Sequence, residues 1–385
     1  MIFMNVRKTY NLSDICRFVT SRTCNIENYI STENMLPNKG GITSPSNIPS
    51  GSAIAYQLGD VLISNIRPYF QKIWQANCDG ACSADVLCIR ANEKADCKYL
   101  YYLLSQQKFF DYVMSGAKGC KMPRGDKSQI MQWQISLPPL AEQKRIADIL
   151  SVIDDKIELN RRINANLEQQ AQALYKSWFV DFEPWGGKMP EDWREGTLGE
   201  ICITNKRSYS GKFYNSFEYL DTGSVTSNKI DTIQLLNPTI DKIPSRARRA
   251  VAEGDILYSS VRPNQKHYMF LYNPSSNMVV STGFIVITAN WSGYRYYIYQ
   301  YLIQDIVIQH LQSIAEQSVS TYPSINASDI TNLEINIPSN EAIEKYANVM
   351  NPIMKQITNN QSENLRLAQL RDTLLPKLMS GEITV

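Results

Sequence analysis

The sequence predicts an α+β chain in which two tandem α+β domains are separated by two long helices packed as an antiparallel coiled coil. Its 385 residues are more than one hydrophobic core usually holds, so two or more domains are expected. Several segments recur roughly 200 residues later in the same order, which is typical of a duplicated unit. Apolar residues recur with a period of about 3.5 over two long stretches, which is typical of a coiled coil.

The duplication defines the domain organisation. "GDVLISNIRP" (59–68) returns as "GDILYSSVRP" (254–263), and "QISLPPLAEQKRIADIL" (134–150) returns as "EINIPSNEAIEKYANVM" (334–350). Each half is therefore a variable domain followed by a long helix. The expected boundaries are 1–139 for the first domain, 140–183 for the central helix, 184–338 for the second domain and 339–385 for the C-terminal helix.

Within each variable domain, strands and short helices mix without a regular βαβ order, which favours α+β. Val61, Ile63 and Ile66 predict a strand of period 2 after a Gly-Asp turn, and the strand that starts at Ile256 repeats it. Residues 99–115 and 294–312 each predict one short amphipathic helix. The segment 182–193 is rich in Pro and Gly, so it predicts a linker after the first long helix.

The two long helices share an unusual apolar seam, because each carries two asparagines in consecutive core positions. In an antiparallel pair, Asn160 would face Asn364 and Asn164 would face Asn360. Each buried amide would then meet another amide, and a slip in register would leave an amide unpaired at a cost of about 1–3 kcal/mol. The alternative is that these asparagines face solvent where the seam is interrupted. The first seam continues through Ile146, Leu150, Ile153 and Ile157, and the second through Tyr346, Met350, Ile353 and Ile357.

Proline interrupts the second helix at two places. Pro352 and Pro376 lie inside the predicted C-terminal helix, where proline removes a backbone donor. Kinks or breaks are therefore expected there.

The motifs of several enzyme classes are missing. His267 and His310 are the only histidines, and neither has a nearby Ser or Cys that would complete a triad. No Gly-rich phosphate-binding loop occurs, and no glycine motif for S-adenosylmethionine, so no catalytic residue and no cofactor are expected. Seven of the eight cysteines precede residue 121, but their spacings form no CxxC pair, so reduced thiols are expected and no metal site.

Basic loops with aromatic and amide neighbours are the candidate contacts to a polymer. Such side chains suit phosphate anchoring and base-edge reading. The alternative is solvated loops and, for the two Arg-Pro pairs, a purely structural role. A formal net charge of +2 does not decide between these readings. The candidates are Lys39, Arg67, Tyr69, Lys72, Lys118, Lys121, Arg124 and Lys127 in the first domain, and Lys242, Arg246, Arg248, Arg249, Arg262, Asn264 and Lys266 in the second, with the loops 116–127 and 241–249 taken as equivalents.

Several segments resemble a known family. "LPPLAEQKRIADILSVIDDKIELNRRINANLEQQAQALYKSWFVDFEP" closely resembles the central conserved region of type I restriction–modification specificity subunits, and "LRDTLLPKLMSGEI" resembles their second conserved region. "GDVLISNIRP", "GDILYSSVRP", "YISTENMLPNKGGI" and "WREGTLGEI" resemble segments of their target-recognition domains. The second long helix departs from the pattern, because "SNEAIEKY" stands where the first helix has "PLAEQKRI".

The resemblance implies a non-catalytic subunit whose two target-recognition domains each read one half of a split double-stranded DNA site. The helix pair would set the spacing and dock two methyltransferase (modification) subunits, with restriction–translocation subunits added for cleavage. The assembled enzyme would be a DNA adenine methyltransferase and ATP-dependent endonuclease that defends the cell against foreign DNA. The partners would then bring the S-adenosylmethionine, ATP and Mg²⁺ chemistry.

Two other functions remain open at this stage. One is a specificity module for a methyltransferase of another type, and the other is a coiled-coil adaptor with two protein-binding heads. A cytoplasmic protein is expected in each case, because no apolar run approaches the ~20 residues of a membrane span and the N-terminus lacks the apolar core of a signal peptide.

Overall fold

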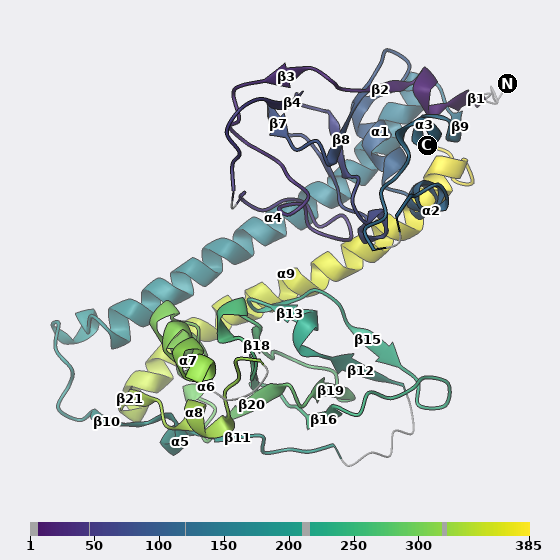
Figure 1. Cartoon of the computed structure of the whole chain (residues 1–385). Helices are drawn as coiled ribbons and strands as arrows, with labels where there is room; N and C mark the ends of the chain where they lie inside the picture. Colours follow the sequence, from purple (N-terminus) through teal and green to yellow (C-terminus); the bar gives the residue numbers. More distant parts are fainter. Residues whose placement is uncertain (1–6, 46, 120, 210–215, 318–321) are drawn as a thin grey trace. The chain divides into compact units, whose positions relative to one another are not determined.

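The computed structural model describes residues 7–45, 47–119, 121–209, 216–317 and 322–385. The chain divides into two compact units, 1–158 with 364–385 and 159–363. Both mix helices and sheets, as the sequence predicts, and each contains one segment of the long helix α4 (Leu140–Phe179) and one of the long helix α9 (Asn340–Ser380) (Figure 1). Helix α4 ends at Phe179, before residue 183, which is the end of the central helix expected from the sequence.

The first unit is built around a four-stranded sheet of order β2-β8-β5-β6, with a three-stranded sheet of order β3-β4-β7 and the pair β1-β9 beside it. Strand β5 is buried at all four positions, because it lies in the interior of its sheet with both faces covered. The elements are β1 (Lys8–Asn11), η1 (Leu12–Asp14), β2 (Cys16–Phe18), β3 (Arg22–Thr23), β4 (Ala53–Tyr56), β5 (Val61–Ser64), η2 (Pro68–Phe70), β6 (Ile73–Gln75), β7 (Gly80–Cys82), β8 (Val86–Ala91), α1 (Cys97–Leu104), α2 (Gln107–Ser115), α3 (Lys127–Met131) and β9 (Gln134–Leu137).

The second unit repeats this plan. Its sheet β11-β20-β17-β18 corresponds to β2-β8-β5-β6, and its pair β10-β21 corresponds to β1-β9. A second four-stranded sheet, β15-β12-β19-β16, and the hairpin β13-β14 complete it. The elements are η3 (Glu183–Trp185), β10 (Arg194–Thr197), α5 (Leu198–Ile201), β11 (Cys202–Thr204), β12 (Phe217–Leu220), η4 (Thr222–Ser224), β13 (Val225–Thr226), β14 (Lys229–Ile230), β15 (Gln234–Leu236), β16 (Ala247–Ala250), β17 (Ile256–Ser259), η5 (Pro263–Gln265), β18 (Tyr268–Phe270), β19 (Met278–Ser281), β20 (Phe284–Ala289), α6 (Tyr294–Leu302), α7 (Asp305–Gln317), α8 (Ala327–Thr331) and β21 (Glu334–Ile337).

The Asp of each Gly-Asp turn is a structural residue. Asp60 is buried, accepts a hydrogen bond from the Gln57 backbone at 2.8 Å and forms two bonds of 2.7 Å with Arg90. Asp255 is buried in the same way, accepts from the Ala252 backbone at 2.8 Å and pairs with Arg207. The repeated Gly-Asp sequence therefore starts the central strand of each sheet with a satisfied carboxylate.

Each amphipathic helix expected from sequence is broken into two. In the first unit, α1 ends at Leu104 and α2 begins at Gln107, because Gln106 adopts an extended backbone (φ −72°, ψ 145°). In the second unit, α6 and α7 are separated in the same way by Ile303 and Gln304. The apolar periodicity does not reveal the break, because the residues on both sides of it are buried in one core: Leu103, Leu104, Phe109 and Phe110.

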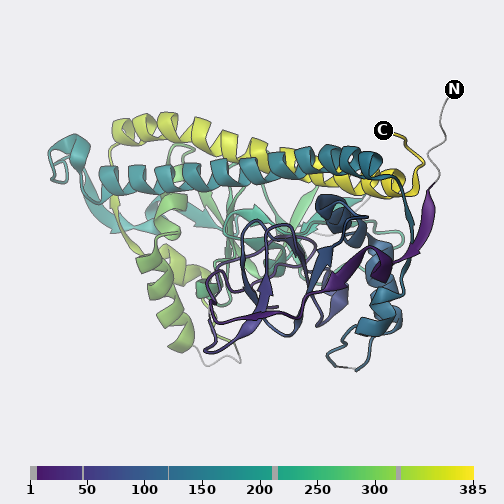
Figure 2. The ribbon, with the colours of Figure 1, turned by 90° about the horizontal axis from the view of Figure 1, so that it is seen from above.

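Within each unit, the segments of α4 and α9 run antiparallel and side by side (Figures 1 and 2). In the first unit, Arg7 bridges Glu142 near the start of α4 to the Leu378 carbonyl near the end of α9, while Asp154 further along α4 pairs with Arg371. In the second unit, Asn160 contacts Glu363, whereas Phe179 packs on Tyr346 with ring centroids 4.8 Å apart. Helix α9 is continuous through Pro352 and Pro376, so the expected breaks do not occur.

The helix seams are part of the domain cores. Ile146 and Leu150 of α4 belong to the core of the first unit together with Leu375 and Leu378 of α9. Residues of both helices likewise enter the core of the second unit, where Phe182, Trp185 and Trp193 of the predicted linker also pack. The helices therefore share a core with each domain, and the seam is more than a coiled-coil contact.

Candidate nucleic-acid interface

The arginine of each repeated motif has a left-handed backbone. Arg67 has φ 51° and Arg262 has φ 50°, and a short 3-10 helix that begins with proline follows each of them. Each 3-10 helix ends at a second left-handed residue, Gln71 (φ 50°) or Lys266 (φ 56°). We call residues 66–71 and 261–266 the Arg-Pro turns. A left-handed non-glycine residue costs about 1–2 kcal/mol, and such strain clusters at functional sites.

A second loop holds each Arg-Pro turn in place. The Arg67 N–H donates to the Pro123 carbonyl at 2.9 Å, and the Arg262 N–H donates to the Pro323 carbonyl at 3.0 Å. Isolated β-bridges join Ile66 to Arg124 and Val261 to Ser324 beside these bonds. We call 116–126 and 322–326 the proline loops. They occupy the same place in the two units, after α2 and before α8 respectively.

The expected equivalence of loops 116–127 and 241–249 is therefore wrong. Loop 116–127 connects α2 to α3, whereas 241–249 leads into the edge strand β16 of a different sheet. The two loops are alike only in their density of basic residues, and a count of charges carries no information on topology. The counterpart of 116–126 is the loop before α8, in which Pro323 repeats Pro123.

In the first unit, the Arg-Pro turn and the proline loop expose aromatic and basic side chains together. Tyr69 and Phe70 are 49% and 38% exposed, with ring centroids 4.7 Å apart. Lys121 is exposed, and the half-exposed Arg124 forms an ion pair with Asp85 at 3.1 Å. The Nε of Arg67 is buried and makes no hydrogen bond to the described residues. The turn therefore positions a guanidinium whose Nε has no hydrogen-bond partner among the described residues.

The remaining first-unit candidates have partners inside the unit. Lys118 pairs with Asp126 at 2.8 Å but stays largely exposed, and the Lys127 ammonium lies 6.0 Å from the Phe18 ring centroid. Lys72 donates to the Thr32 carbonyl at 2.7 Å, and burial lowers its pKa.

The side chain of Lys39 is largely enclosed by the fold. Its side chain is 14% exposed and pairs with Asp372 of α9 at 3.5 Å. Burial is the largest influence on Lys39 and lowers its pKa, although Asp372 acts in the opposite direction. Its ammonium is thus directed at the long helix.

In the second unit, Arg262 stacks on an aromatic residue of the proline loop. Its guanidinium lies 5.3 Å from the ring centroid of Tyr322, which is 58% exposed. Asn264 is exposed, and its backbone N–H donates to the Gln312 side chain. Lys266 pairs with Asp305 at 2.8 Å, and this bond raises the lysine pKa.

The 241–249 loop adds basic residues through a different sheet. Lys242, Arg246 and Arg248 are exposed, whereas Arg249 is half-buried in β16, with an Nε that makes no hydrogen bond to the described residues. The Arg246 carbonyl accepts from the Thr282 N–H, and the next residue, Gly283, accepts from the Ser260 N–H. Backbone hydrogen bonds thus connect this loop to the start of the second Arg-Pro turn.

Three of the four seam asparagines lie in the second unit. The Asn360 amide donates to Asn164 Oδ1 at 2.8 Å, and the Asn164 amide donates to the Ile357 carbonyl at 3.1 Å. Asn160 donates to Glu363 at 2.6 Å. Asn164 and Asn360 are thus brought together, and both are buried, as is Asn160. Asn364 belongs to the first unit and is half-buried, so its pairing with Asn160 stays a prediction.

Sequence reasoning missed the aromatic and apolar members of the two surfaces. Phe70, Met122 and Tyr322 are exposed beside the basic candidates. An available signal was the alignment of "KMPRGDKSQI" (121–130) with "TYPSINASDI" (321–330), which repeats the proline at an offset of 200 residues. That alignment would have paired the proline loops correctly.

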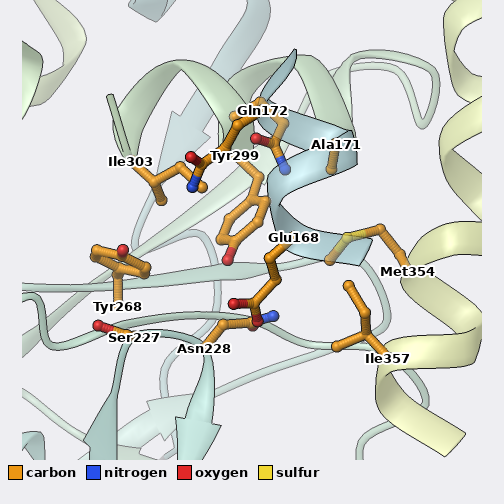
Figure 3. Close-up of a pocket in the computed structure, with 11 residues that line it drawn as sticks. Glu168, Ala171, Gln172, Ser227, Asn228, Tyr268, Tyr299, Ile303, Met354 and Ile357 are labelled. Carbon is orange, nitrogen blue, oxygen red and sulfur yellow. The ribbon is translucent and has the colours of Figure 1, made fainter. Parts of the chain in front are cut away.

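The described part of the chain offers no metal cluster and no membrane span. No group of three or more His, Cys, Asp or Glu residues there is placed to hold a metal ion. No helix among those residues is long and apolar enough to cross a membrane. A cavity beside α4 in the second unit has a volume of about 30 Å³, which is room for a water molecule or two and not for an organic cofactor (Figure 3).

The sequence matches the type I restriction modification DNA specificity domain twice, over residues 7–169 and 190–368. The chain belongs to this family. Each match spans one variable domain and a large part of the long helix that follows it, so the duplication seen in the fold is also a duplication of the family domain. The family membership supports a DNA specificity component and gives no support to a coiled-coil adaptor with protein-binding heads.

Relatives and one solved structure carry the same family name. The MjaIX specificity subunit of Methanocaldococcus jannaschii is 27% identical over 308 residues, which cover 75% of this chain and 69% of the relative. The HindI specificity subunit of Haemophilus influenzae is 32% identical over 184 residues, 48% of this chain and 40% of the relative. The crystal structure of the type I system S subunit from M. genitalium aligns over 98% of both chains with a TM-score of 0.56 at 16% identity, which shows a shared fold.

Proposed function

We propose that this specificity protein reads a bipartite double-stranded DNA site, with one half-site bound by each unit. The observation that carries the proposal is the pair of Arg-Pro turns. The same strained backbone is built twice and displays different side chains, with Tyr69 after the Arg-Pro pair in one unit and Asn264 in the other. Two turns of one geometry with different chemistry suit two half-sites of different sequence.

The charges divide into contacts that position the DNA and contacts that read it. Lys118, Lys121 and the exposed residues of 241–249 are suited to phosphate oxygens, because they are exposed point charges on loops. Arg67 and Arg262 are suited to base edges, because a guanidinium held by a fixed backbone can donate in a bidentate manner to guanine. The pairs of Arg124 with Asp85 and Lys266 with Asp305 involve exposed groups that contribute little to stability and can be exchanged for phosphate contacts.

The helices complete the proposal. The helices expose apolar as well as polar side chains, with Val152 and Leu370 67% and 48% exposed. These faces would dock two methyltransferase subunits, and the helix pair would set the gap between half-sites. Those subunits, joined by restriction–translocation subunits for cleavage, would supply the catalytic groups, so this chain itself would not be catalytic.

Exchange of one domain tests the proposal. Residues 1–139 of this chain would be replaced by the corresponding domain of a relative with a different site, and the chimera would be expressed with its methyltransferase. Mapping of methylated bases across a genome should show one new half-site and one unchanged half-site. If both half-sites change, or neither does, the two units are not independent readers.

A further inference from the structure

Each unit contains a second strained turn directly beside its Arg-Pro turn. Asn38 and Lys39 have φ of 54° and 60°, and Ser227 and Asn228 have φ of 46° and 62°. Among the described residues, these are the two places where consecutive non-glycine residues are left-handed. Because such pairs normally need glycine, specific contacts must hold them. We call them the paired left-handed turns.

On one side, both turns are bonded to the end of the Arg-Pro turn. In the first unit, the Asn38 N–H donates to the Phe70 carbonyl at 2.8 Å, and the Lys39 N–H donates to Gln71 at 3.0 Å. In the second unit, the Ser227 N–H donates to the Lys266 carbonyl at 2.8 Å, and the Asn228 N–H donates to Tyr268 at 2.9 Å. Each paired turn therefore donates two backbone N–H groups to the segment where its Arg-Pro turn ends, although the second turn is bonded further along the chain, up to the start of β18 at Tyr268.

On the other side, the first turn is fixed to the long helices by charge. Lys39 pairs with Asp372 at 3.5 Å, Asp372 pairs with Arg371 at 3.0 Å, and Arg371 pairs with Asp154 of α4 at 2.8 Å. The Tyr102 hydroxyl also donates to Asp154 at 2.7 Å. The side chains of Lys39 and Arg371 are each 14% exposed, whereas that of Asp372 is 51% exposed, so the two cations are enclosed and the carboxylate between them is open on one side.

The second turn is fixed to the helices by amides and a carboxyl group. The Gln361 amide of α9 donates to the Asn228 carbonyl at 2.7 Å, and Asn228 Oδ1 accepts from the Phe270 N–H at 3.0 Å. Figure 3 shows Glu168 of α4 directed at Asn228 beside the small cavity. The backbone attachment is thus similar to that of the first unit, whereas the side chains that reach the helices are different.

We propose that the paired left-handed turns are braces that carry the position of the long helices to the Arg-Pro turns, with Lys39 and Asn228 as positioning residues. The inference rests on the proposed DNA-reading function and assigns to Lys39 a role other than DNA contact. A base-reading side chain must be held to within about 0.5 Å of its productive position. None of the contacts described above joins an Arg-Pro turn directly to a long helix, so the paired left-handed turn is the connection between them. Loss of a brace should therefore weaken sequence discrimination at one half-site.

The test is Lys39→Met in the complete methyltransferase complex, with Lys39→Arg as the conservative variant. Two quantities are measured: methylation of DNA with randomised half-sites, and the salt dependence of DNA binding. A brace predicts about tenfold weaker discrimination at one half-site, the other half-site unchanged, and an unchanged salt slope. A phosphate contact predicts the opposite, a slope smaller by about one with the sequence preference kept, and would overturn the proposal.

The conservative variant separates positioning from a general loss of the side chain. Lys39→Arg keeps a cation opposite Asp372 and leaves the Asp372–Arg371 pair intact, so it should retain discrimination at that half-site. Asn228→Gly keeps the left-handed backbone and the carbonyl that accepts from Gln361, but it removes the side-chain amide. This variant should weaken sequence discrimination at the other half-site. A Lys39→Arg variant that loses discrimination as Lys39→Met does would refute the brace, as would a Lys39→Met variant that discriminates normally. If the unmodified complex recognises no bipartite site, the proposed function fails first.

Discussion

The side-chain amide of Asn360 donates to Oδ1 of Asn164 at 2.8 Å, inside the helix pair of the second unit. Both residues are at most 9% exposed, and Gln356 donates to the Asn360 Oδ1 at 2.7 Å. One hydrogen bond thus joins the two amides, and the side-chain N–H group of Asn164 is satisfied by the Ile357 carbonyl. A buried amide without such partners would cost about 1–3 kcal/mol.

Asn164→Leu should destabilise the chain by more than the double change Asn164→Leu with Asn360→Leu. The single change leaves the Asn360 amide buried without its acceptor, whereas the double change replaces both amides by apolar side chains. The coupling should be about 1–2 kcal/mol, measured by urea unfolding of all four proteins of the cycle. Asn359→Leu, at an exposed position of α9, is the matched control. Additive effects would mean that the amides contribute independently.

The heptad pattern was sufficient to find this seam but not to find every partner in it. It placed Ile146, Leu150, Met350 and Ile357 in the core, and all four are buried. It could not show that Asn160 donates to Glu363, because glutamate at a flanking position looks solvent-facing in any heptad. Long side chains reach across a seam from positions that periodicity assigns to the surface.

The reading surfaces were less predictable than the fold. The repeated "RP" dipeptide identified Arg67 and Arg262, and the structure gives both the same left-handed backbone. Charge alone could not show that Lys39 pairs with Asp372, which lies at the far end of the sequence. A contact between residues so far apart has no local pattern, so only the fold reveals it.

Arg67→Gly should weaken DNA binding without loss of stability. Glycine relieves the strain at φ 51°, which is worth about 1 kcal/mol, while the guanidinium that we assign to base reading is removed. The melting temperature should stay the same or rise, and the affinity for DNA that contains the recognition site should fall at least tenfold. Gln71→Gly relieves similar strain at φ 50° without removing a charge, and should bind DNA nearly normally. A misfolded Arg67→Gly protein would assign the residue to the scaffold.

Lys121→Ala with Arg124→Ala should flatten the salt dependence of DNA binding. Removal of each phosphate-binding side chain should lower the slope by about one, and sequence preference should change little. Both residues lie on the first proline loop. The ion pair of Arg124 with Asp85 is exposed and weak, so it does not prevent Arg124 from contacting a phosphate. Binding would be measured from about 50 to 300 mM salt, with Lys98→Ala on α1 as the control. An unchanged slope would show that this loop does not meet the phosphates.

Glu168 should make the second unit less stable as the pH rises toward 7. Burial raises the pKa of Glu168 to about 7, while the Asn228 amide acts weakly in the opposite direction. In the unfolded chain, the carboxyl group would titrate near its usual value of about 4.3. Between these values the folded state holds a proton that the unfolded state has released, so stability is complete below about pH 4.3 and falls as the pH rises through 7.

Glu168→Gln should remove this slope. The variant should gain up to about 3 kcal/mol relative to the unmodified chain between pH 5 and pH 8, measured by urea unfolding. The titratable groups beside Glu168 from the other elements are Tyr268 and Tyr299, whose pKa values are raised by burial, so they stay neutral throughout this range. Glu344→Gln, at an exposed position of α9, is the control. Parallel pH profiles for Glu168→Gln and the unmodified chain would mean that the carboxyl group is hydrated.

The helix pair should act as the ruler for the gap between half-sites. Four residues inserted after Ala165 in α4, with four more after Asn359 in α9, keep the facing segments in step and add about 6 Å of rise and one full turn plus about 40°. One base pair of B-DNA adds about 3.4 Å and roughly 35° of twist, so the inserted rotation nearly matches one additional base pair. The variant should methylate the same two half-sites with a gap one or two base pairs longer, as mapped across a genome. Three residues inserted at the same points rotate the second unit by about 60° in the opposite sense, and this variant should lose methylation at any gap length. If the four-residue variant instead stays active at the original gap, contacts outside the helices must set the spacing.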